Sequence, residues 1–253
     1  MPKIVGEYLD ISDCNLSMGK IFTTKFGGLL GVDNFNPKGD TVLLMQKIVK
    51  GDPFNPFYGV RGEIAEKIVK KYFDQVKAEY KWYGAETQTY DMFNNSAFGG
   101  NLDFAIKTKD SIASFEVKSK NIKDYAFIKN NGIQPVHLAQ AQLGVYLANY
   151  SNGFVAYVFF TDEQEEKINN KTFNIDFDWT NEMFSTQFLI FNCFFNENQI
   201  VEKMQSAYDY YLDCLMEKKI PLKDISDKSL SKLGLSRPVN IFARGINNST
   251  NQL

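Results

Sequence analysis

Two acidic residues and a lysine have the types and spacing needed for chemistry on a bound metal ion. The segment GGNLDFAIKTKDSIASFEVKSK contains Asp103 and, 13 residues later, Glu116, Val117 and Lys118. Alternate residues of a strand point to the same face, so Glu116 and Lys118 should lie together. If two strands pair through a loop near residues 107–111, Asp103 comes close to Glu116. The two carboxylates could then share a Mg²⁺, with the carbonyl oxygen of Val117 as a further ligand.

Such a site suits the hydrolysis of a phosphodiester. A divalent cation neutralises charge on the phosphate and lowers the pKa of a water molecule, and Lys118 can orient that water or stabilise the developing negative charge. A second metal ion could be held by an acid from the preceding helix, where Glu66 is the better candidate and Glu63, one turn away, stays open. A Glu-x-Lys triplet alone also occurs on ordinary half-exposed strands. The specific signal is its combination with Asp103, an acidic helix before it and a glutamine-bearing helix after it.

The elements that must position these residues follow from hydrophobic periodicity and turn signals. They predict one α/β domain with a central mixed β-sheet flanked by helices, over residues 1–225, and a C-terminal extension at 226–253 that is polar and mobile. From residue 222 onward we expect irregular structure, and at 32–40 a turn-rich loop. The expected elements are a short helix within 15–31 that ends at Gly31, a helix around 64–73, an antiparallel meander of strands at 81–94, 99–109 and 111–120, a helix at 135–151, a buried strand at 153–162 and a helix at 201–221 that Pro221 ends.

Composition narrows the classes of function. The chain has 253 residues, of which 44% are hydrophobic, enough for one substantial core. Its net charge of -2 means that any contact with nucleic acid must come from a local cluster of basic residues. The single histidine, His137, excludes multi-histidine metal sites and is expected to be structural, so metal chemistry must rest on carboxylates, which favour Mg²⁺ or Mn²⁺.

Cysteine usage and hydropathy indicate the compartment. Cys14, Cys193 and Cys214 are far apart and lack the paired spacing of zinc or iron-sulfur sites, so we expect reduced thiols. No stretch approaches the roughly 20 apolar residues of a membrane span, and the N-terminal segment lacks a signal-peptide pattern. The sequence predicts a cytoplasmic protein with no membrane association.

The chain resembles a known family at several of these positions. NLDF followed by FEVKSK resembles the core of the PD-(D/E)xK nucleases, whose fold is restriction-endonuclease-like. The wider pattern is similar to the YqaJ-like viral recombinase branch that includes lambda exonuclease. IFTTKFGGLLGVDNF resembles the N-terminal helix and loop of that branch, GVRGEIAEKIV its RGxxxE element, QAQLGVY its glutamine helix and AYDYYLDCLMEKKIP its closing helix, over roughly residues 11–225. The chain departs from the family pattern at two positions, since Leu102 replaces the proline of the motif and Phe104 replaces a glycine that is usual in this branch. Proline and glycine have no side-chain group that takes part in the chemistry, so neither departure removes a catalytic group.

The resemblance implies roles for further residues. It places Glu66 at the acidic helix position of the family. The spacing of the viral recombinases favours Gln140 as the active-site glutamine, whereas the QxxxY pattern of RecB-type nucleases favours Gln142 together with Tyr146. Because the two glutamines are two apart, they point to different sides of a helix. Either could instead belong to a solvated face.

Two segments offer candidates for contact with DNA phosphates. The resembling segment implies that Thr23, Thr24 and Lys25 hold a phosphate, with Thr24 and Lys25 as the main candidates, although the three could instead form the polar turn of a helix. Arg61 could contact the DNA backbone or could simply be solvated beside a turn.

The function implied by the resemblance is a Mg²⁺-dependent nuclease acting on double-stranded DNA, as a 5′-to-3′ exonuclease of phage or prophage recombination. It implies a single-strand annealing protein as partner and a homo-oligomer, a trimer by analogy. An endonuclease of restriction or repair type, or a non-catalytic DNA-binding module that retains the fold, are the alternatives. The presence of Asp103, Glu116 and Lys118 together argues against the non-catalytic module.

Overall fold

A five-stranded mixed sheet lies at the centre of the computed structural model, which describes residues 1–53, 55–83 and 97–238. Its strand order is β4-β6-β7-β8-β9. β7 and β8 pair in parallel, and the other neighbours pair antiparallel. This confirms the predicted fold class. The strands are β4 (Tyr80–Trp82), β6 (Phe104–Lys107), β7 (Ile112–Asn121), β8 (Asn152–Phe160) and β9 (Phe188–Cys193).

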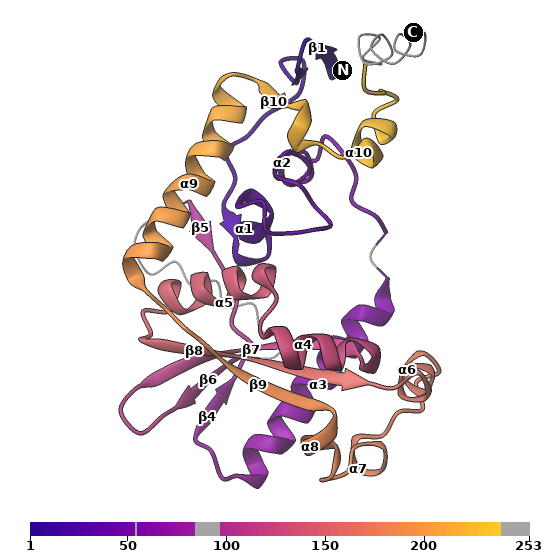
Figure 1. Ribbon diagram of the computed structural model, residues 1–253, viewed down its shortest axis with the longest axis vertical. Helices are drawn as coiled ribbons and strands as arrows, with labels where there is room; N and C mark the ends of the chain where they lie inside the picture. Colours follow the sequence, from indigo (N-terminus) through magenta and orange to yellow (C-terminus); the bar gives the residue numbers. More distant parts are fainter. Residues whose placement is uncertain (54, 84–96, 239–253) are drawn as a thin grey trace, which may run out of the picture.

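Helices cover both faces of this sheet (Figure 1). α3 (Pro56–Gln75) begins where Asn55 caps the backbone N–H of Phe57, and it packs its apolar stripe on one face with Phe104 and Phe115. α4 (Tyr125–Asn131) and α5 (Pro135–Leu147) cover the other face. β8 supplies both faces, because Ala156, Val158 and Phe160 face α3 whereas Val155, Tyr157 and Phe159 face α4 and α5. A continuous apolar run is expected of such a doubly covered strand.

A second core lies beside the sheet and joins α5 to the N-terminal and C-terminal parts of the chain. α1 (Thr23–Leu29), α2 (Lys38–Met45) and α9 (Glu197–Met216) contribute to it. In Figure 1, α9 runs along one side of the molecule from β9 to the small sheet near the N-terminus. Gly27 lets α1 approach α5 closely, because a Cβ there would lie 2.9 Å from the side chain of Val136.

Two small sheets and several short helices complete the described chain. β1 (Lys3–Val5), β2 (Tyr8–Asp10) and β10 (Lys219–Pro221) form an antiparallel sheet, and β3 (Ile21–Phe22) pairs in parallel with β5 (Phe98–Gly99). The short helices are η1 (Ile122–Asp124), α6 (Asp162–Asn169), α7 (Ile175–Asp178), α8 (Met183–Thr186), η2 (Leu222–Asp224) and α10 (Asp227–Lys232).

Several predicted elements differ from the observed ones. The strand predicted at 99–109 is divided into β5 and β6, so that Asp103 lies just before β6 rather than on a strand. The turn-rich loop predicted at 32–40 includes the start of α2. The late helix ends at Met216, and Pro221 belongs to β10. The strand predicted at 81–94 is seen only as the end of β4, and its residues from 84 onward lie outside the described ones.

The expectation of irregular structure from residue 222 onward was wrong for its first part. η2 and α10 form there, and Leu222, Ile225 and Leu230 are buried in the second core. Their burial supplies the apolar contacts that hold this segment in place. Residues 239–253, where the sequence predicts mobility, lie outside the described residues, and the domain boundary at 225 stays a prediction.

No described helix combines the length and the apolar character that crossing a membrane requires. The three cysteines are free thiols, and Cys193 and Cys214 are buried.

Candidate active site

The register of β6 and β7 brings Asp103 beside Glu116. Phe104 pairs with Phe115, so the residue before β6 lies opposite the residue that follows Phe115. Asp103 Oδ2 accepts a hydrogen bond of 2.7 Å from the backbone N–H of Val117, and the Asp103 carbonyl oxygen accepts one from Tyr83 N–H at 3.0 Å. These two contacts fix the carboxylate at the end of the strand pair.

Glu116, Lys118 and Gln140 form a closed triangle of hydrogen bonds. Lys118 Nζ donates to Glu116 Oε1 at 2.6 Å and to Gln140 Oε1 at 2.9 Å. Gln140 Nε2 donates to Glu116 Oε1 at 2.7 Å. Glu116 is buried, and the side chain of Lys118 is 18% exposed, so this pair is largely protected from solvent. The same-face prediction for Glu116 and Lys118 is therefore confirmed, and α5 provides the third member.

Glu66 approaches the same region from α3. Its Oε2 accepts a hydrogen bond of 2.8 Å from the indole Nε1–H of Trp82 on β4. Glu66 is half-buried, whereas Glu63 is exposed. The structure thus turns Glu66 rather than Glu63 toward the sheet.

Burial and crowding of the acids perturb their protonation. Burial raises the pKa of Asp103 well above its usual range, and the negative charge of Glu116 raises this pKa further, against opposing effects of Lys118 and the Val117 N–H. Burial also raises the pKa of Glu66, and the charge of Glu116 adds to this, whereas the Trp82 hydrogen bond lowers it. Acids held close together at low solvent access favour binding of a proton or a cation.

The donor set fits a hard divalent cation. Asp103 and Glu116 offer carboxylate oxygens and Val117 a backbone carbonyl, which are the ligand types that Mg²⁺ and Mn²⁺ prefer. Across residues 1–53, 55–83 and 97–238, no three acidic, histidine or cysteine side chains converge closely enough to ligate one ion. Lys118 donates a hydrogen bond to one oxygen of Glu116, and Trp82 donates one to an oxygen of Glu66.

Gln142 faces away from this cluster. Its Nε2 donates to the carbonyl oxygen of Phe194 at 2.7 Å, and its Oε1 accepts from Lys203 Nζ at 3.0 Å. Both ends of the amide are therefore used to join α5 to the start of α9. The two contacts do not support the catalytic role left open for Gln142, whereas Gln140 is in contact with Glu116 and Lys118.

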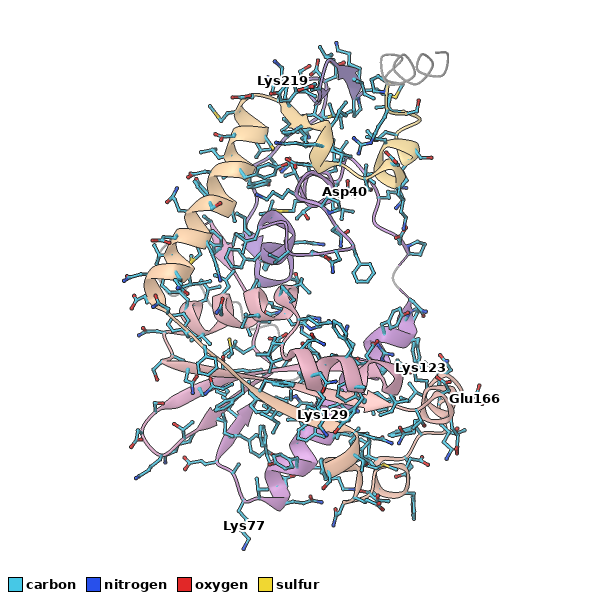
Figure 2. The ribbon with its side chains drawn as sticks, in the orientation of Figure 1. Asp40, Lys77, Lys123, Lys129, Glu166 and Lys219 are labelled. Carbon is cyan, nitrogen blue, oxygen red and sulfur yellow. The ribbon has the colours of Figure 1, made fainter. Side chains whose placement is uncertain are left out.

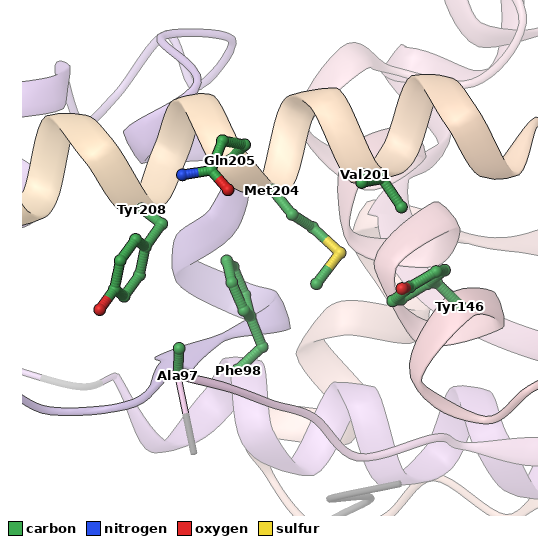
Figure 3. A pocket seen from close by; sticks show the side chains of 7 residues that line it. All are labelled: Ala97, Phe98, Tyr146, Val201, Met204, Gln205 and Tyr208. Carbon is green, nitrogen blue, oxygen red and sulfur yellow. The ribbon is translucent and has the colours of Figure 1, made fainter. Parts of the chain in front are cut away.

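Tyr146 is also separate from the cluster. It lines a cavity of about 320 Å³ between α5, β5 and α9, together with Phe98, Met204 and Tyr208 (Figure 3). The cavity lies beside the second core, so the QxxxY pattern places its tyrosine away from Glu116.

Arg61 is engaged within the protein. Its guanidinium donates to Glu165 Oε1 at 2.5 Å and to the hydroxyl and carbonyl oxygens of Ser119 at 3.2 Å each. The side chain is only 11% exposed. These contacts tie α3 to β7 and α6, and they do not support the predicted contact of Arg61 with the DNA backbone.

Thr24 and Lys25 lie in the first turn of α1. Thr24 is exposed and Lys25 half-buried, whereas Thr23 is packed against Gly100, where a Cβ would lie 2.3 Å from its Cγ2. Pairing of Phe22 with Gly99 places this turn at the segment that leads to Asp103. The position is compatible with a phosphate contact near the acids.

Two residues near the cluster were missed by the sequence reasoning. Trp82 on β4 bonds to Glu66, and Lys120 lies two residues beyond Lys118 on β7. The alternation that pairs Glu116 with Lys118 extends to Lys120, so this signal was present in the sequence. The partner of Trp82 depends on the register of β4 with β6, which no local pattern reveals.

Comparison with solved structures gives close matches of fold at low sequence identity. A phage-related exonuclease from Haemophilus somnus 129PT matches with a TM-score of 0.56 and 14% identity, over 80% of this chain and 98% of the other. The alkaline exonuclease LHK-Exo from Laribacter hongkongensis matches with a TM-score of 0.53 and 15% identity, over 79% of this chain and 90% of the other. The chain has the fold of these exonucleases. LHK-Exo in complex with dAMP matches equally well, with a TM-score of 0.53 and 14% identity.

This exonuclease fold agrees with the resemblance to lambda-exonuclease-like nucleases seen in the sequence. No protein-family model matches the chain, and no curated protein matches it. At such low identity the solved structures establish the fold, and the chemistry must be inferred from the site.

Proposed function

We propose that the chain is a metal-dependent DNA nuclease of PD-(D/E)xK type that hydrolyses phosphodiester bonds. The observation that carries the proposal is the buried contact of Glu116 with Lys118 and Gln140, beside Asp103, within an exonuclease fold. A bound Mg²⁺ or Mn²⁺ would be held by Asp103, Glu116 and the Val117 carbonyl, and Glu66 would provide a ligand for a second ion. It would supply charge neutralisation at the phosphate and a water molecule of lowered pKa.

Lys118 has one proton available for this chemistry. An ammonium group has three donors, and Glu116 and Gln140 accept two of them. The third can donate to the attacking water or to a phosphate oxygen, where it stabilises the negative charge that develops. Gln140 positions Lys118, because its oxygen accepts from the ammonium while its nitrogen donates to Glu116.

The finer proposal is a 5′-to-3′ exonuclease acting on double-stranded DNA in phage or prophage recombination. It is supported by the names of two structural neighbours, which are exonucleases, and by the first turn of α1, where Thr24 and Lys25 could hold a terminal 5′ phosphate. The implied partners are a single-strand annealing protein and further copies of this chain, a trimer by analogy with the viral recombinases.

The test is digestion of DNA by the purified protein with Mg²⁺ or Mn²⁺. Linear and covalently closed circular duplexes are incubated in parallel, with a chelator as control. Digestion of the linear DNA only is the expected result. Cutting of both forms would favour an endonuclease built from the same residues, and cleavage of neither form would contradict the nuclease proposal.

A further inference from the structure

Lys120 is a half-buried lysine beside the proposed active site, and no partner for its ammonium is found in residues 1–53, 55–83 and 97–238. Strand alternation puts it on the same face of β7 as Glu116 and Lys118, and it pairs with Phe159 in the neighbouring strand. Among the described residues, no acceptor lies within hydrogen-bond or ion-pair distance of its ammonium. Its neighbours differ, because Lys118 contacts Glu116 and Lys123 contacts Asp162.

Charged groups on its own strand and on two neighbouring elements act on Lys120. Burial lowers its pKa, and Arg61 from α3 and Lys118 from β7 lower it further, whereas Asp124 at the end of η1 has the opposite effect. Arg61 already has Glu165 as its partner. Arg61 and Lys118 each contact a carboxylate, whereas no carboxylate of the described residues contacts Lys120.

His137 on α5 is close to these lysines and carries no negative charge. His137 Nδ1 lies 2.8 Å from the hydroxyl of Tyr157, which also accepts a hydrogen bond from the Gln134 N–H. Burial and the charges of Lys118 and Lys120 lower the pKa of His137 to about 2, so its ring is neutral at pH 7. Among the residues that the structure describes, Lys120 thus lies next to the acids without a carboxylate in contact with its ammonium.

An anion would offset the cost of keeping this cation partly buried. Residues two apart on a strand are about 6.6 Å apart, which is comparable with the separation of neighbouring phosphates along one nucleic-acid strand. A strand that places its scissile phosphate at Lys118 therefore brings the next phosphate to Lys120.

We propose that Lys120 binds the phosphate adjacent to the scissile one on the cleaved strand. This inference rests on the proposed nuclease function and adds a positioning contact for its substrate. Neutralising a second phosphate would hold the strand in register, so that the scissile bond stays aligned with Asp103 and Glu116.

The test compares charge removal on the protein with charge removal on the DNA. Single-turnover cleavage is measured on linear duplexes with ordinary phosphates, and on duplexes with one uncharged methylphosphonate immediately 5′ or 3′ of the first linkage cleaved. The variants are Lys120→Gln, which removes the charge but keeps a polar side chain, and Lys120→Arg, which keeps the charge. Lys77→Gln is the matched control, because Lys77 is exposed and lies beyond the C-terminal end of α3, near the end of the molecule opposite β1 (Figure 2). Thermal unfolding verifies that each variant is folded.

A methylphosphonate on one of the two sides should slow the wild-type protein roughly tenfold, as expected for loss of a charged hydrogen bond. Lys120→Gln should be slowed by a similar factor on ordinary DNA and should lose its sensitivity to that methylphosphonate. Lys120→Arg and Lys77→Gln should behave as the wild type. Two results would overturn the Lys120 site while the nuclease proposal stands. One is cleavage of ordinary DNA by Lys120→Gln at the wild-type rate, and the other is a slowing of Lys120→Gln by each methylphosphonate that equals the slowing of the wild type.

A binding measurement separates the two proposals when there is no cleavage. Binding of the ordinary duplex by Glu116→Gln is followed as a function of salt, with and without Lys120→Gln. The slope of log affinity against log salt should decrease in magnitude by about 1 when Lys120 loses its charge. Absence of cleavage by the wild-type protein would overturn the nuclease proposal, while a reduced slope would still support the Lys120 site. An unchanged slope, or no binding of DNA, would overturn that site.

Discussion

The two glutamines of α5 differ in what they contact, although only one residue separates them. Positions two apart on a helix are rotated by about 200°, so Gln140 reaches Glu116 and Lys118 while Gln142 reaches Phe194 and Lys203. The sequence alone left this choice open, because the two family patterns favour different glutamines. Packing of α5 between the sheet and α9 turns Gln140 toward Glu116 and turns Gln142 toward Lys203 on α9.

We expect Gln140→Ala to reduce cleavage by roughly tenfold or more, because Lys118 would lose the group that positions it. The thermal unfolding temperature should change little. Gln142→Ala should retain the cleavage rate and lower stability by about 1 kcal/mol, because the carbonyl oxygen of Phe194 and the ammonium of Lys203 lose their partner. Cleavage rates and unfolding curves of the two variants check this. Slower cleavage by Gln142→Ala, with an unchanged rate for Gln140→Ala, would place Gln142 at the site.

Asp103 should make the metal-free protein less stable at neutral pH. Its pKa is raised in the folded state, so the folded protein holds this proton more tightly than the unfolded chain does. The stabilisation that protonation provides is complete below the unfolded pKa, near 3.8, and is lost as pH rises through the higher folded pKa. Asp103→Asn should therefore raise the unfolding temperature at pH 7 in the presence of a chelator, and this gain should shrink toward pH 4.

The comparison with added cation makes this prediction specific. Mg²⁺ should stabilise the wild-type protein more than Asp103→Asn, since ligand binding to the folded state alone raises stability. Thermal unfolding at both pH values, with chelator or Mg²⁺, gives the answer. If Asp103→Asn is less stable than the wild type at pH 7 with chelator, the surroundings of Asp103 do not disfavour its charged form.

At the level of elements, α3 brings an acid to the sheet through its contact with β4. Glu66 is half-buried and bonded to Trp82, whereas Glu63 is exposed one turn earlier. Glu66→Gln should lower metal-dependent cleavage more than Glu63→Gln, because Glu66 is close enough to Asp103 and Glu116 for their charges to interact, whereas Glu63 is exposed. Titration of Mg²⁺ against the cleavage rate should show a higher requirement in Glu66→Gln. Equal and negligible effects would mean that α3 supplies no acid.

Elements with strong local signals could be predicted from the sequence. The helical spacing of Ile64, Ile68 and Phe73 predicted α3, and the apolar run from residue 153 predicted β8 as a buried central strand. Alternation along β7 predicted the shared face of Glu116 and Lys118. These features depend on periodicity within one segment, which the sequence displays directly.

The elements missed by the sequence depend on contacts between distant segments. β5 is two residues long and exists because it pairs with β3, and β10 exists because it pairs with β2. The early end of α9 follows from the same pairing, since the chain must turn at Lys218, with φ of 56°, to bring Lys219 opposite Asp10. Local propensity says little about pairings between segments so far apart in the chain.

At the scale of the whole molecule, the pairing of β3 with β5 sets α1 against the segment that carries Asp103. If Thr24 and Lys25 hold a terminal 5′ phosphate, removal of that phosphate from linear duplex should slow digestion, because a charged anchor for the end is lost. The double variant Thr24→Ala, Lys25→Ala should degrade phosphorylated and unphosphorylated ends at similar low rates. Digestion time courses on the two substrates provide the comparison. A wild-type protein that is indifferent to the 5′ phosphate would remove this support for an exonuclease while leaving the metal site unaffected.

The measurement that tests the proposed chemistry most directly is single-turnover cleavage of linear duplex DNA with saturating Mg²⁺ by matched variants. Asp103→Asn, Glu116→Gln and Lys118→Ala should each be slower by at least about a hundredfold, because each loses a metal ligand or a charge needed in the transition state. Glu166→Gln, on the exposed surface of α6 (Figure 2), should cleave as the wild type does. Circular dichroism should show that all four variants are folded. Wild-type rates in any of the three site variants would contradict the role assigned to that residue, and wild-type rates in all three would contradict the active site proposed for this fold.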